Sequence, residues 1–187
     1  MAQCAWPKDD ERMQAYHDTE WCRPSRDERY LFEMLCLEGA QAGLSWQIVL
    51  SKRDSYKDAF RNFDIDYCAD LTDEALAGIK ENYGVIKHGG KLESVRTNAR
   101  AVKAIQSEFT GFADYLWSFT GGKAVINEWQ SDEQVPAQSE LSVKLSKDLK
   151  KRGFKFVGPV TAYSFLQAVG MVDDHLITCP CHTGNRK

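Results

Sequence analysis

Apolar residues recur along most of this chain at the three-to-four spacing of a buried helical face. The spacing is seen in residues 31–36, 48–60, 71–79, 92–105 and 112–119, with Ile48 on the expected buried face of the second segment. Ser25 followed by Glu28 fits a capping box before the first segment. Because strands with one buried face would alternate with a period of two, and clean alternation is missing, the sequence predicts an all-α fold.

The chain is long enough for one sizeable core, because it has 187 residues of which 43% are apolar. We therefore expect a single domain over residues 1–187. Residues 120–140 are rich in glycine and polar side chains and predict a long connection with room for a short hairpin, not a domain boundary. A long apolar run and a signal-peptide pattern are both missing, so we expect a cytoplasmic protein without a membrane partner.

Residues 139–170 contain the clearest helix start and stop signals. A basic segment over 139–152 stops at Gly153, "FKFVG" follows as a tight turn, and Pro159 opens an apolar helix that ends at Gly170. This order predicts a helix-hairpin-helix. Gly158 would let a ligand approach the backbone, and the free amides of the second helix would suit a phosphate, although an ordinary helical corner is the alternative.

Charge is distributed unevenly. The net charge of −3 argues against indiscriminate binding to nucleic acid, yet residues 144–155 hold six basic side chains against one aspartate. Residues 84–103 form a second positive stretch. A solvated helix face is the alternative for each. The first stretch lies beside the predicted turn, and this combination favours contact with a DNA backbone.

Cysteine and histidine cluster near both ends of the chain. Six cysteines in a reducing compartment predict thiols or metal ligands, with Cys36 and Cys68 expected in the core. "HLITC" places His175 and Cys179 close enough to share an ion, and a closed zinc site needs four ligands. We expect the other ligands from the N-terminal segment, so that one structural zinc ion is held by Cys4, His17, His175 and Cys179. Competing local ligands are Cys181 and His182, and unliganded side chains are a further alternative.

Four motifs identify a family. "AYHDTEW", "LFEMLCLEGAQAGLSW", "KKRGFKFVGPVTAYSFLQA" and "DHLITCPC" resemble the bacterial 3-methyladenine DNA glycosylase I family, from Cys4 to the C-terminus. The resemblance implies an all-helical helix-hairpin-helix DNA glycosylase with zinc on the four residues proposed above. It also implies a monomer that acts on double-stranded DNA containing alkylated adenine, in the bacterial cytoplasm and at the nucleoid when active.

The resemblance also assigns the pocket. 3-Methyladenine in DNA carries a positive charge, so the enzyme needs flat aromatic rings to stack on it and a carboxylate to favour the cation. Glu38 is the expected catalytic carboxylate, although its sequence context alone would suit a surface glutamate. The expected base-binding residues are four aromatic side chains: Tyr16, Trp46, Trp21 and Trp6.

Expected DNA contacts come from two segments. In "GAQAGLS", Gly43 and Leu44 would form an apolar wedge that fills the space of the flipped nucleotide. The second segment is the predicted turn, with these expected contacts: Lys155, Phe156 and Gly158.

Related helix-hairpin-helix glycosylases use an aspartate near the position of Asp173 and Asp174. Here Asp174 is expected to support a zinc ligand, with Glu38 ranked above both aspartates. No lysine is placed for a Schiff base, so we expect base release without strand cleavage. The alternatives are a zinc-stabilised DNA-binding module without activity and a glycosylase for another lesion.

Overall fold

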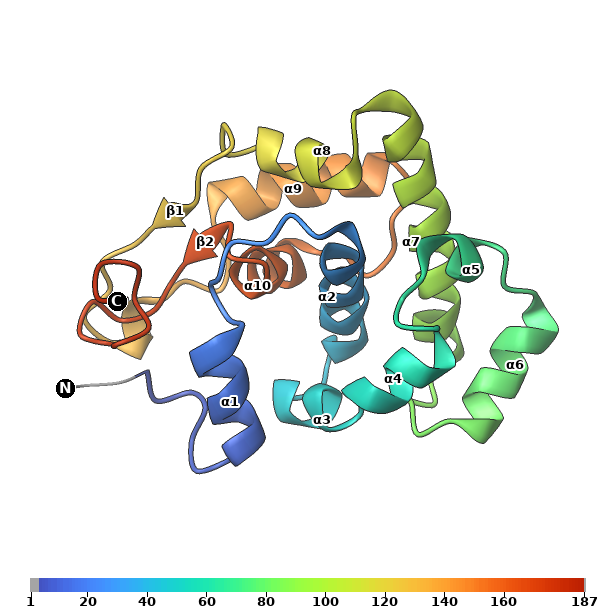
Figure 1. Cartoon of the computed structure of the whole chain (residues 1–187), viewed down its shortest axis with the longest axis horizontal. Coiled ribbons are helices and arrows are strands. Elements are labelled where there is room, and N and C mark those ends of the chain that lie inside the picture. The colour runs from blue at the N-terminus through green and yellow to red at the C-terminus, as the bar shows by residue number, and fades with distance from the viewer. Residues whose placement is uncertain (1–3, 187) are drawn as a thin grey trace.

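The structure, a computed structural model, describes residues 4–186. Helices dominate it, as predicted. In Figure 1, α2 and α10 lie at the centre, the N- and C-terminal segments lie near each other on one side, and α5 and α6 lie on the other. In chain order the elements are α1 (Glu11–Thr19), α2 (Glu28–Gln41), α3 (Trp46–Ser51), α4 (Arg53–Ala59), α5 (Ile65–Ala69), α6 (Asp73–Asn82), α7 (Gly89–Glu108), α8 (Phe112–Ser118), β1 (Val125–Ile126), the 3-10 helix η1 (Asp132–Gln134), α9 (Glu140–Lys151), α10 (Pro159–Ala168) and β2 (Val172–Asp173).

Helix α2 is the centre of the core. Every residue from Leu31 to Ala40 is buried, because α3, α7, α8 and α10 all pack against this helix. A helix buried on all sides tolerates few polar groups, so Glu33 and Glu38 are exceptional in it. Cys36 and Cys68 are buried, which confirms their placement in the core. Within residues 4–186, none of the helices is long and apolar enough to cross a membrane.

The capping box predicted at Ser25 is wrong. Helix α2 begins at Glu28, and the carboxylate of Asp27 accepts a hydrogen bond from the Tyr30 amide at 2.7 Å. Ser25 belongs instead to the segment before α2. Its backbone amide donates a hydrogen bond to the Val169 carbonyl at the end of α10, at 3.1 Å. Tertiary hydrogen bonds therefore set where this helix starts.

The single buried face expected over residues 48–60 is also wrong. Two short helices, α3 and α4, replace it, with Lys52 at the junction between them. The change of direction leaves Ile48 43% exposed, whereas Val49 and Phe60 are fully buried. An apolar spacing continued across a bend no longer describes one face.

The connection over residues 120–140 does not form a hairpin. Its strand β1 pairs in parallel with β2 from the C-terminal segment, with Val125 opposite Val172. The Ile177 amide adds a hydrogen bond to the Trp129 carbonyl at 2.8 Å. The long connection is therefore fastened to the C-terminal segment, a pairing that local sequence does not encode.

The predicted helix, turn and helix are confirmed as structure. Ser139 caps α9, which ends at Lys151 before Gly153 takes a positive φ of 90°. Gly158 precedes α10, whose first residue is Pro159. Gly170, also with a positive φ, lies so close to the backbone of residues 23–24 that a β-carbon there would be 2.1 Å from the Arg23 carbonyl carbon.

Candidate functional site

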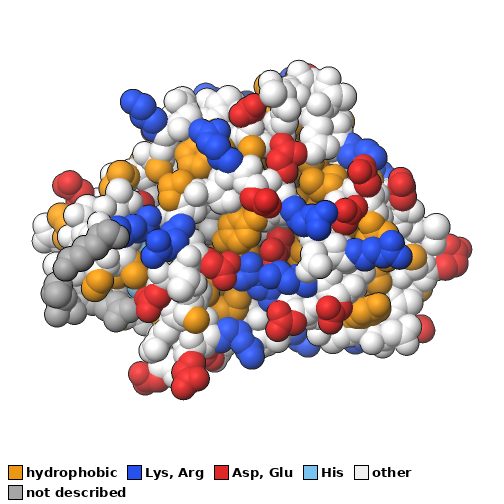
Figure 2. Space-filling model, viewed as in Figure 1, with side chains coloured by type: hydrophobic (Ala, Val, Ile, Leu, Met, Phe, Trp, Pro, Cys, Tyr) orange, Lys and Arg blue, Asp and Glu red, His pale blue; other side chains and the backbone are white. Residues whose placement is uncertain are grey.

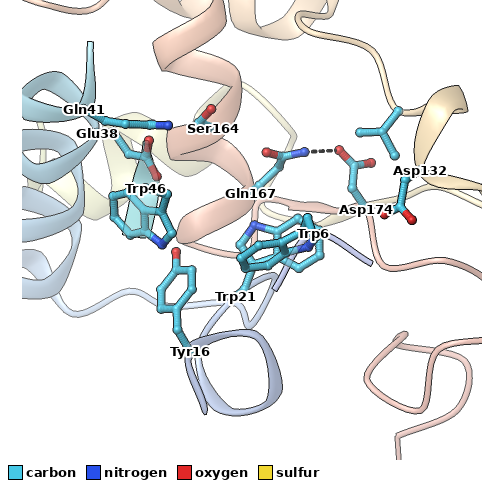
Figure 3. Close-up of a pocket in the computed structure, with 11 residues that line it drawn as sticks. Trp6, Tyr16, Trp21, Glu38, Gln41, Trp46, Asp132, Ser164, Gln167 and Asp174 are labelled. Carbon is cyan, nitrogen blue, oxygen red and sulfur yellow. Dashed lines mark hydrogen bonds between the residues drawn. The ribbon is translucent and has the colours of Figure 1, made fainter. Parts of the chain in front are cut away.

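A pocket of about 340 Å³ opens between α1, α2, α3, α10 and the loop that contains η1. Figure 3 shows the side chains of these separate segments converging on it. All five residues expected to recognise or act on the base line this pocket. The lining residues are Trp6, Tyr16, Trp21, Glu38, Gln41, Trp46, Asp132, Val135, Ser164, Gln167 and Asp174.

Four polar side-chain atoms in this pocket are buried and have no hydrogen-bond partner. They are Trp6 Nε1, Tyr16 Oη, Glu38 Oε2 and Trp46 Nε1. Buried polar groups are nearly always paired, because leaving one unpaired costs about 1–3 kcal/mol. Three donors and one acceptor left open in a single pocket point to a polar, partly aromatic ligand that completes them.

Glu38 lies one turn from the end of α2 and is only 5% exposed. Burial raises the pKa of its carboxyl from 4.5 to about 8, because no positive group offsets the loss of water. Burial and the neighbouring Glu38 also raise the pKa of Tyr16 well above its ordinary value. A cationic ligand would offset the cost of ionising Glu38, while Tyr16 stays neutral and can donate its hydroxyl proton.

The aromatic rings are held by contacts with one another. The rings of Tyr16 and Trp46 are 5.3 Å apart, and those of Trp6 and Trp21 are 4.9 Å apart. Figure 3 shows the Tyr16 hydroxyl pointing toward Trp46, with the Glu38 carboxyl group beyond it. Rings fixed in this way can stack on a flat base without losing further side-chain entropy.

The four expected metal ligands lie together in a separate buried cluster. All ligand atoms of Cys4, His17, His175 and Cys179 are within 4.8 Å of one another. Both sulfur atoms are 3.7 Å from His175 Nδ1, and the two histidine nitrogens are 3.1 Å apart. Zinc bonds of about 2.3 Å to sulfur and about 2.0 Å to nitrogen, in a tetrahedron, would separate sulfur from nitrogen by roughly 3.6 Å and nitrogen from nitrogen by roughly 3.3 Å.

The remaining ring nitrogens also fit a metal site. His17 Nδ1 is 2.6 Å from the Asp18 carboxylate, and His175 Nε2 is 3.2 Å from the Trp21 carbonyl. Each contact leaves the other ring nitrogen free to face the cluster. Burial is the largest cause that raises the pKa of Cys4 and lowers that of His175, so both groups are neutral when no ion is bound.

The alternative ligands lie outside this cluster, although Cys181 lies next to it, in a group with His17 and Asp18 whose ligand atoms are also within 4.8 Å of one another. Cys181 Sγ is 3.7 Å from the Asp18 carboxylate, and His182 Nε2 is 3.0 Å from the Asn127 carbonyl. The expected support of a zinc ligand by the Asp174 carboxylate is wrong. Its hydrogen bonds go to four donors away from the cluster, whereas Asp18 and the Trp21 carbonyl contact the histidines.

The cluster and the pocket share their walls. The Trp6 ring is 5.6 Å from the His17 ring, and the Trp21 ring is 4.7 Å from the His175 ring. Tyr16 and His17 are also consecutive in α1. Anything that displaces the cluster would therefore displace aromatic side chains that line the pocket.

Helix α7 positions both segments expected to contact DNA. At its start, the buried Lys91 ammonium donates to the Ala40 and Ala42 carbonyls at 2.8 and 2.6 Å, which fixes the loop that presents Gly43 and the 37% exposed Leu44. Two turns later, the Asn98 side chain bonds the backbone amide and carbonyl of Lys155 at 2.8 and 3.2 Å.

The turn that follows Lys155 lies directly against α2. A β-carbon at Gly39, next to Glu38, would be 3.2 Å from Phe156 Cβ. Phe156 is only partly buried, and Gly158 begins α10 without a side-chain cap. The turn and the Leu44 loop therefore approach the same end of α2.

The two basic stretches have different roles. In residues 84–103, the basic side chains bond the protein itself: Lys91 caps α2, Arg96 pairs with Asp73, and Lys103 pairs with Asp66. In residues 144–155, all five lysines are exposed. Figure 2 shows acidic and basic side chains interspersed over one face, without a broad field of one sign.

Sequence reasoning missed several lining residues. Gln41 follows Glu38 by three positions, and Ser164 and Gln167 are also three apart, so helical spacing could have placed each pair on one face. Asp174 was noted in the sequence for its place near the aspartate of related glycosylases, but its four hydrogen-bond partners could not be read from local spacing.

Known proteins resemble this chain over nearly its whole length. The family described as methyladenine glycosylase matches residues 6–182. A protein named DNA-3-methyladenine glycosylase from Haemophilus influenzae is 45% identical over 180 residues, which cover 96% of this chain and 97% of that protein. DNA-3-methyladenine glycosylase 1 of Escherichia coli is 42% identical over 186 residues, and 100% of both chains is covered.

Solved structures of the same family resemble this chain in fold as well. A variant of 3-methyladenine DNA glycosylase I in complex with 3-methyladenine is 35% identical and has a TM-score of 0.94, with 97% of this chain and 98% of that chain covered. A crystal structure of 3-methyladenine DNA glycosylase I is 45% identical and has a TM-score of 0.93, with 97% of this chain and 100% of that chain covered. The chain therefore belongs to the methyladenine glycosylase family.

Proposed function

We propose that this protein is a base excision repair enzyme that hydrolyses the N-glycosidic bond of 3-methyladenine in alkylated DNA. The observation that carries the proposal is the set of four unpaired polar atoms, all of which line one aromatic pocket. Family membership makes the same assignment.

The pocket suits a cationic purine taken out of the duplex. Trp46 would stack on the base, while the Tyr16 hydroxyl and the ionised Glu38 carboxylate would form hydrogen bonds with its edge. The carboxylate would also favour the positive charge of the base. Because the methylated base leaves as a neutral molecule, little acid catalysis is required. Water then attacks the sugar, which resembles an oxocarbenium ion in the transition state. Trp6 and Trp21 close the other side of the pocket.

We further propose that Cys4, His17, His175 and Cys179 hold one structural zinc ion. Two thiolates would neutralise its charge, and four protein ligands leave no open position for water. The ion would join the two terminal segments and thereby hold Tyr16, Trp6 and Trp21 in place. It would supply folding free energy and would not take part in the reaction.

For DNA, we propose that α9, the turn and α10 act as a helix-hairpin-helix on the backbone of the duplex. Lys155, Phe156 and the Gly158 backbone would contact phosphates, while Leu44 on its glycine-containing loop would fill the space left by the flipped nucleotide. In the bacterial cell, this activity would place the protein at the nucleoid.

We also propose that the base is released without strand cleavage. A Schiff base needs an amine such as that of lysine near the sugar, and none of the described residues that line the pocket is a lysine, which supports hydrolysis alone. We propose in addition that the protein acts as a monomer.

The test is release of free bases from methylated duplex DNA, measured by chromatography. We expect 3-methyladenine in the released fraction and an abasic strand that breaks only after alkali treatment. Binding to the DNA without base release would support the alternative, a zinc-stabilised DNA-binding module without activity.

A further inference from the structure

Asp174 has a carboxylate that is only 1% exposed and accepts four hydrogen bonds. Oδ1 accepts from Asn127 Nδ2 and Trp129 Nε1, both at 2.7 Å. Oδ2 accepts from Tyr163 Oη at 2.5 Å and from Gln167 Nε2 at 2.6 Å. A carboxylate offers about four lone-pair positions, so Asp174 has no acceptor capacity left for a reacting water.

The carboxylate fixes the orientation of the Gln167 amide. An ionised carboxylate only accepts hydrogen bonds, so Gln167 must present its NH2 group to Asp174. Its amide oxygen then points the other way. Figure 3 shows this oxygen on the pocket side, turned toward Ser164 and away from Asp174. Bonding to a charged acceptor also polarises the amide and makes its oxygen a stronger acceptor.

The position of Gln167 separates it from the base-recognition groups. Glu38, Tyr16 and Trp46 come from α2, α1 and α3, whereas Gln167 belongs to α10 on the facing wall of the pocket. A purine stacked on Trp46 with its edge at Glu38 would place its sugar and the attacking water toward Gln167.

We propose that the Gln167 amide oxygen orients the water that attacks the sugar, and that Asp174 is a positioning residue that acts through Gln167. The proposal rests on the function proposed above. The water oxygen forms the new bond to C1′ as the bond between C1′ and the base breaks, and the bonding pair leaves with the base, which becomes neutral. The proton lost by the water passes to solvent, because an amide oxygen orients a water molecule but is too weak a base to retain its proton.

Asp174→Asn tests this with almost no change in volume. Trp129 Nε1 is only a donor, so the new amide must keep its oxygen toward Trp129 and place its NH2 beside Gln167. Gln167 then has to turn over and present its own NH2 to the pocket. We expect the single-turnover release of 3-methyladenine from methylated duplex DNA to fall by about tenfold or more, the equivalent of one hydrogen bond.

The double variant Asp174→Asn with Gln167→Glu restores an oxygen to the pocket, because the amide introduced at position 174 can donate to the carboxylate introduced at position 167. We expect it to recover most of the lost rate. Asn127→Ala is the matched control, since it removes a donor from the same carboxylate but leaves the Gln167 contact in place. We expect that control to remain within a few-fold of the wild-type rate. Affinity for free 3-methyladenine and the bound zinc should be unchanged in all three variants.

A wild-type rate in Asp174→Asn, or a double variant no faster than the single one, would overturn the proposal. If Asn127→Ala and Asp174→Asn lowered the rate of base release equally, the role of Asp174 would be structural. A parallel loss of free-base affinity would make Gln167 a base contact instead. If the wild-type protein released no 3-methyladenine, the proposed function itself would fail, which is a different result.

Discussion

Replacing Glu38 with glutamine tests the chemistry of the pocket most directly. Glutamine keeps the shape of the side chain and one acceptor oxygen but cannot ionise. Methylation fixes the positive charge on the substrate base, so the charge of the protein partner is the quantity that changes. The consequence for catalysis and the consequence for stability have opposite signs, which makes the variant informative.

The size of the catalytic effect follows from an ordinary contact distance between two charges and from the pKa of Glu38. A carboxylate about 4 Å from a cation gains roughly 4 kcal/mol at an effective dielectric constant of about 20. With a pKa of about 8, ionising Glu38 at pH 7 costs roughly 1.4 kcal/mol of this. The net loss in Glu38→Gln is therefore about 2.5–3 kcal/mol, or about a hundredfold in kcat/KM at pH 7.

The pH dependence follows from the same pKa. The free wild-type enzyme gains its charge as the pH rises through about 8, so its kcat/KM should increase up to that pH and then level off. Glutamine shows no such rise. The ratio between wild type and variant should therefore grow by about tenfold between pH 7 and pH 9, to about a thousandfold.

Stability changes in the other direction. At pH 7 the Glu38 carboxyl is ionised in the unfolded chain, where its pKa is near 4.5, and is mostly protonated in the folded chain. Folding therefore takes up a proton, and the free energy of unfolding falls as the pH rises from about 4.5 to about 8. Glu38→Gln removes this cost, so the variant should be more stable by up to roughly 3 kcal/mol at pH 7 and no more stable near pH 4.5.

Two assays decide the matter: single-turnover base release from methylated duplex DNA at subsaturating enzyme over about pH 6–9, which measures kcat/KM, and equilibrium unfolding in urea. The exposed Glu81→Gln is the matched control and should change neither. A constant ratio of wild type to variant between pH 7 and pH 9 would refute the role of the ionised carboxylate. An inactive variant that is also less stable would show that packing, and not charge, explains the loss.

The remaining predictions concern the metal cluster and the DNA-contacting loop. Cys4→Ser should abolish stoichiometric zinc binding, measured by elemental analysis, whereas Cys181→Ser should retain it. The reverse result would make Cys181 the ligand in place of Cys4. Leu44→Ala should slow base release from duplex DNA by about tenfold without changing the affinity for free 3-methyladenine, and a loss in both would contradict a wedge role. Lys91→Met leaves two carbonyls of α2 and its loop without their donor, so it should lower the free energy of unfolding by about 1–3 kcal/mol and speed amide exchange over residues 39–45; unchanged exchange would contradict this capping role.

The helical character of the chain, and the helix ends and turn within residues 139–170, could be predicted from the amino-acid order alone. These features are local, because helical periodicity, Pro159 at a helix start and Gly153 after a helix end each act within a few residues. The motifs also placed Glu38 and the aromatic residues in one site, and the types of residue at the two ends of the chain predicted a shared cluster. Each of those predictions says which residues come together. The ligand preferences of zinc and the charge of the substrate base restrict that choice strongly.

The way in which these groups are held became clear only from the packing of the whole chain. The segment before α2 bonds to the end of α10, so the cap at the start of α2 is Asp27 and not Ser25, and β1 paired with β2 instead of forming a hairpin. The burial that raises the pKa of Glu38 comes from the helices around α2, and the four bonds to Asp174 come from residues 127 to 167. Such contacts depend on the packing of distant segments, and neither periodicity nor local propensity carries information about them.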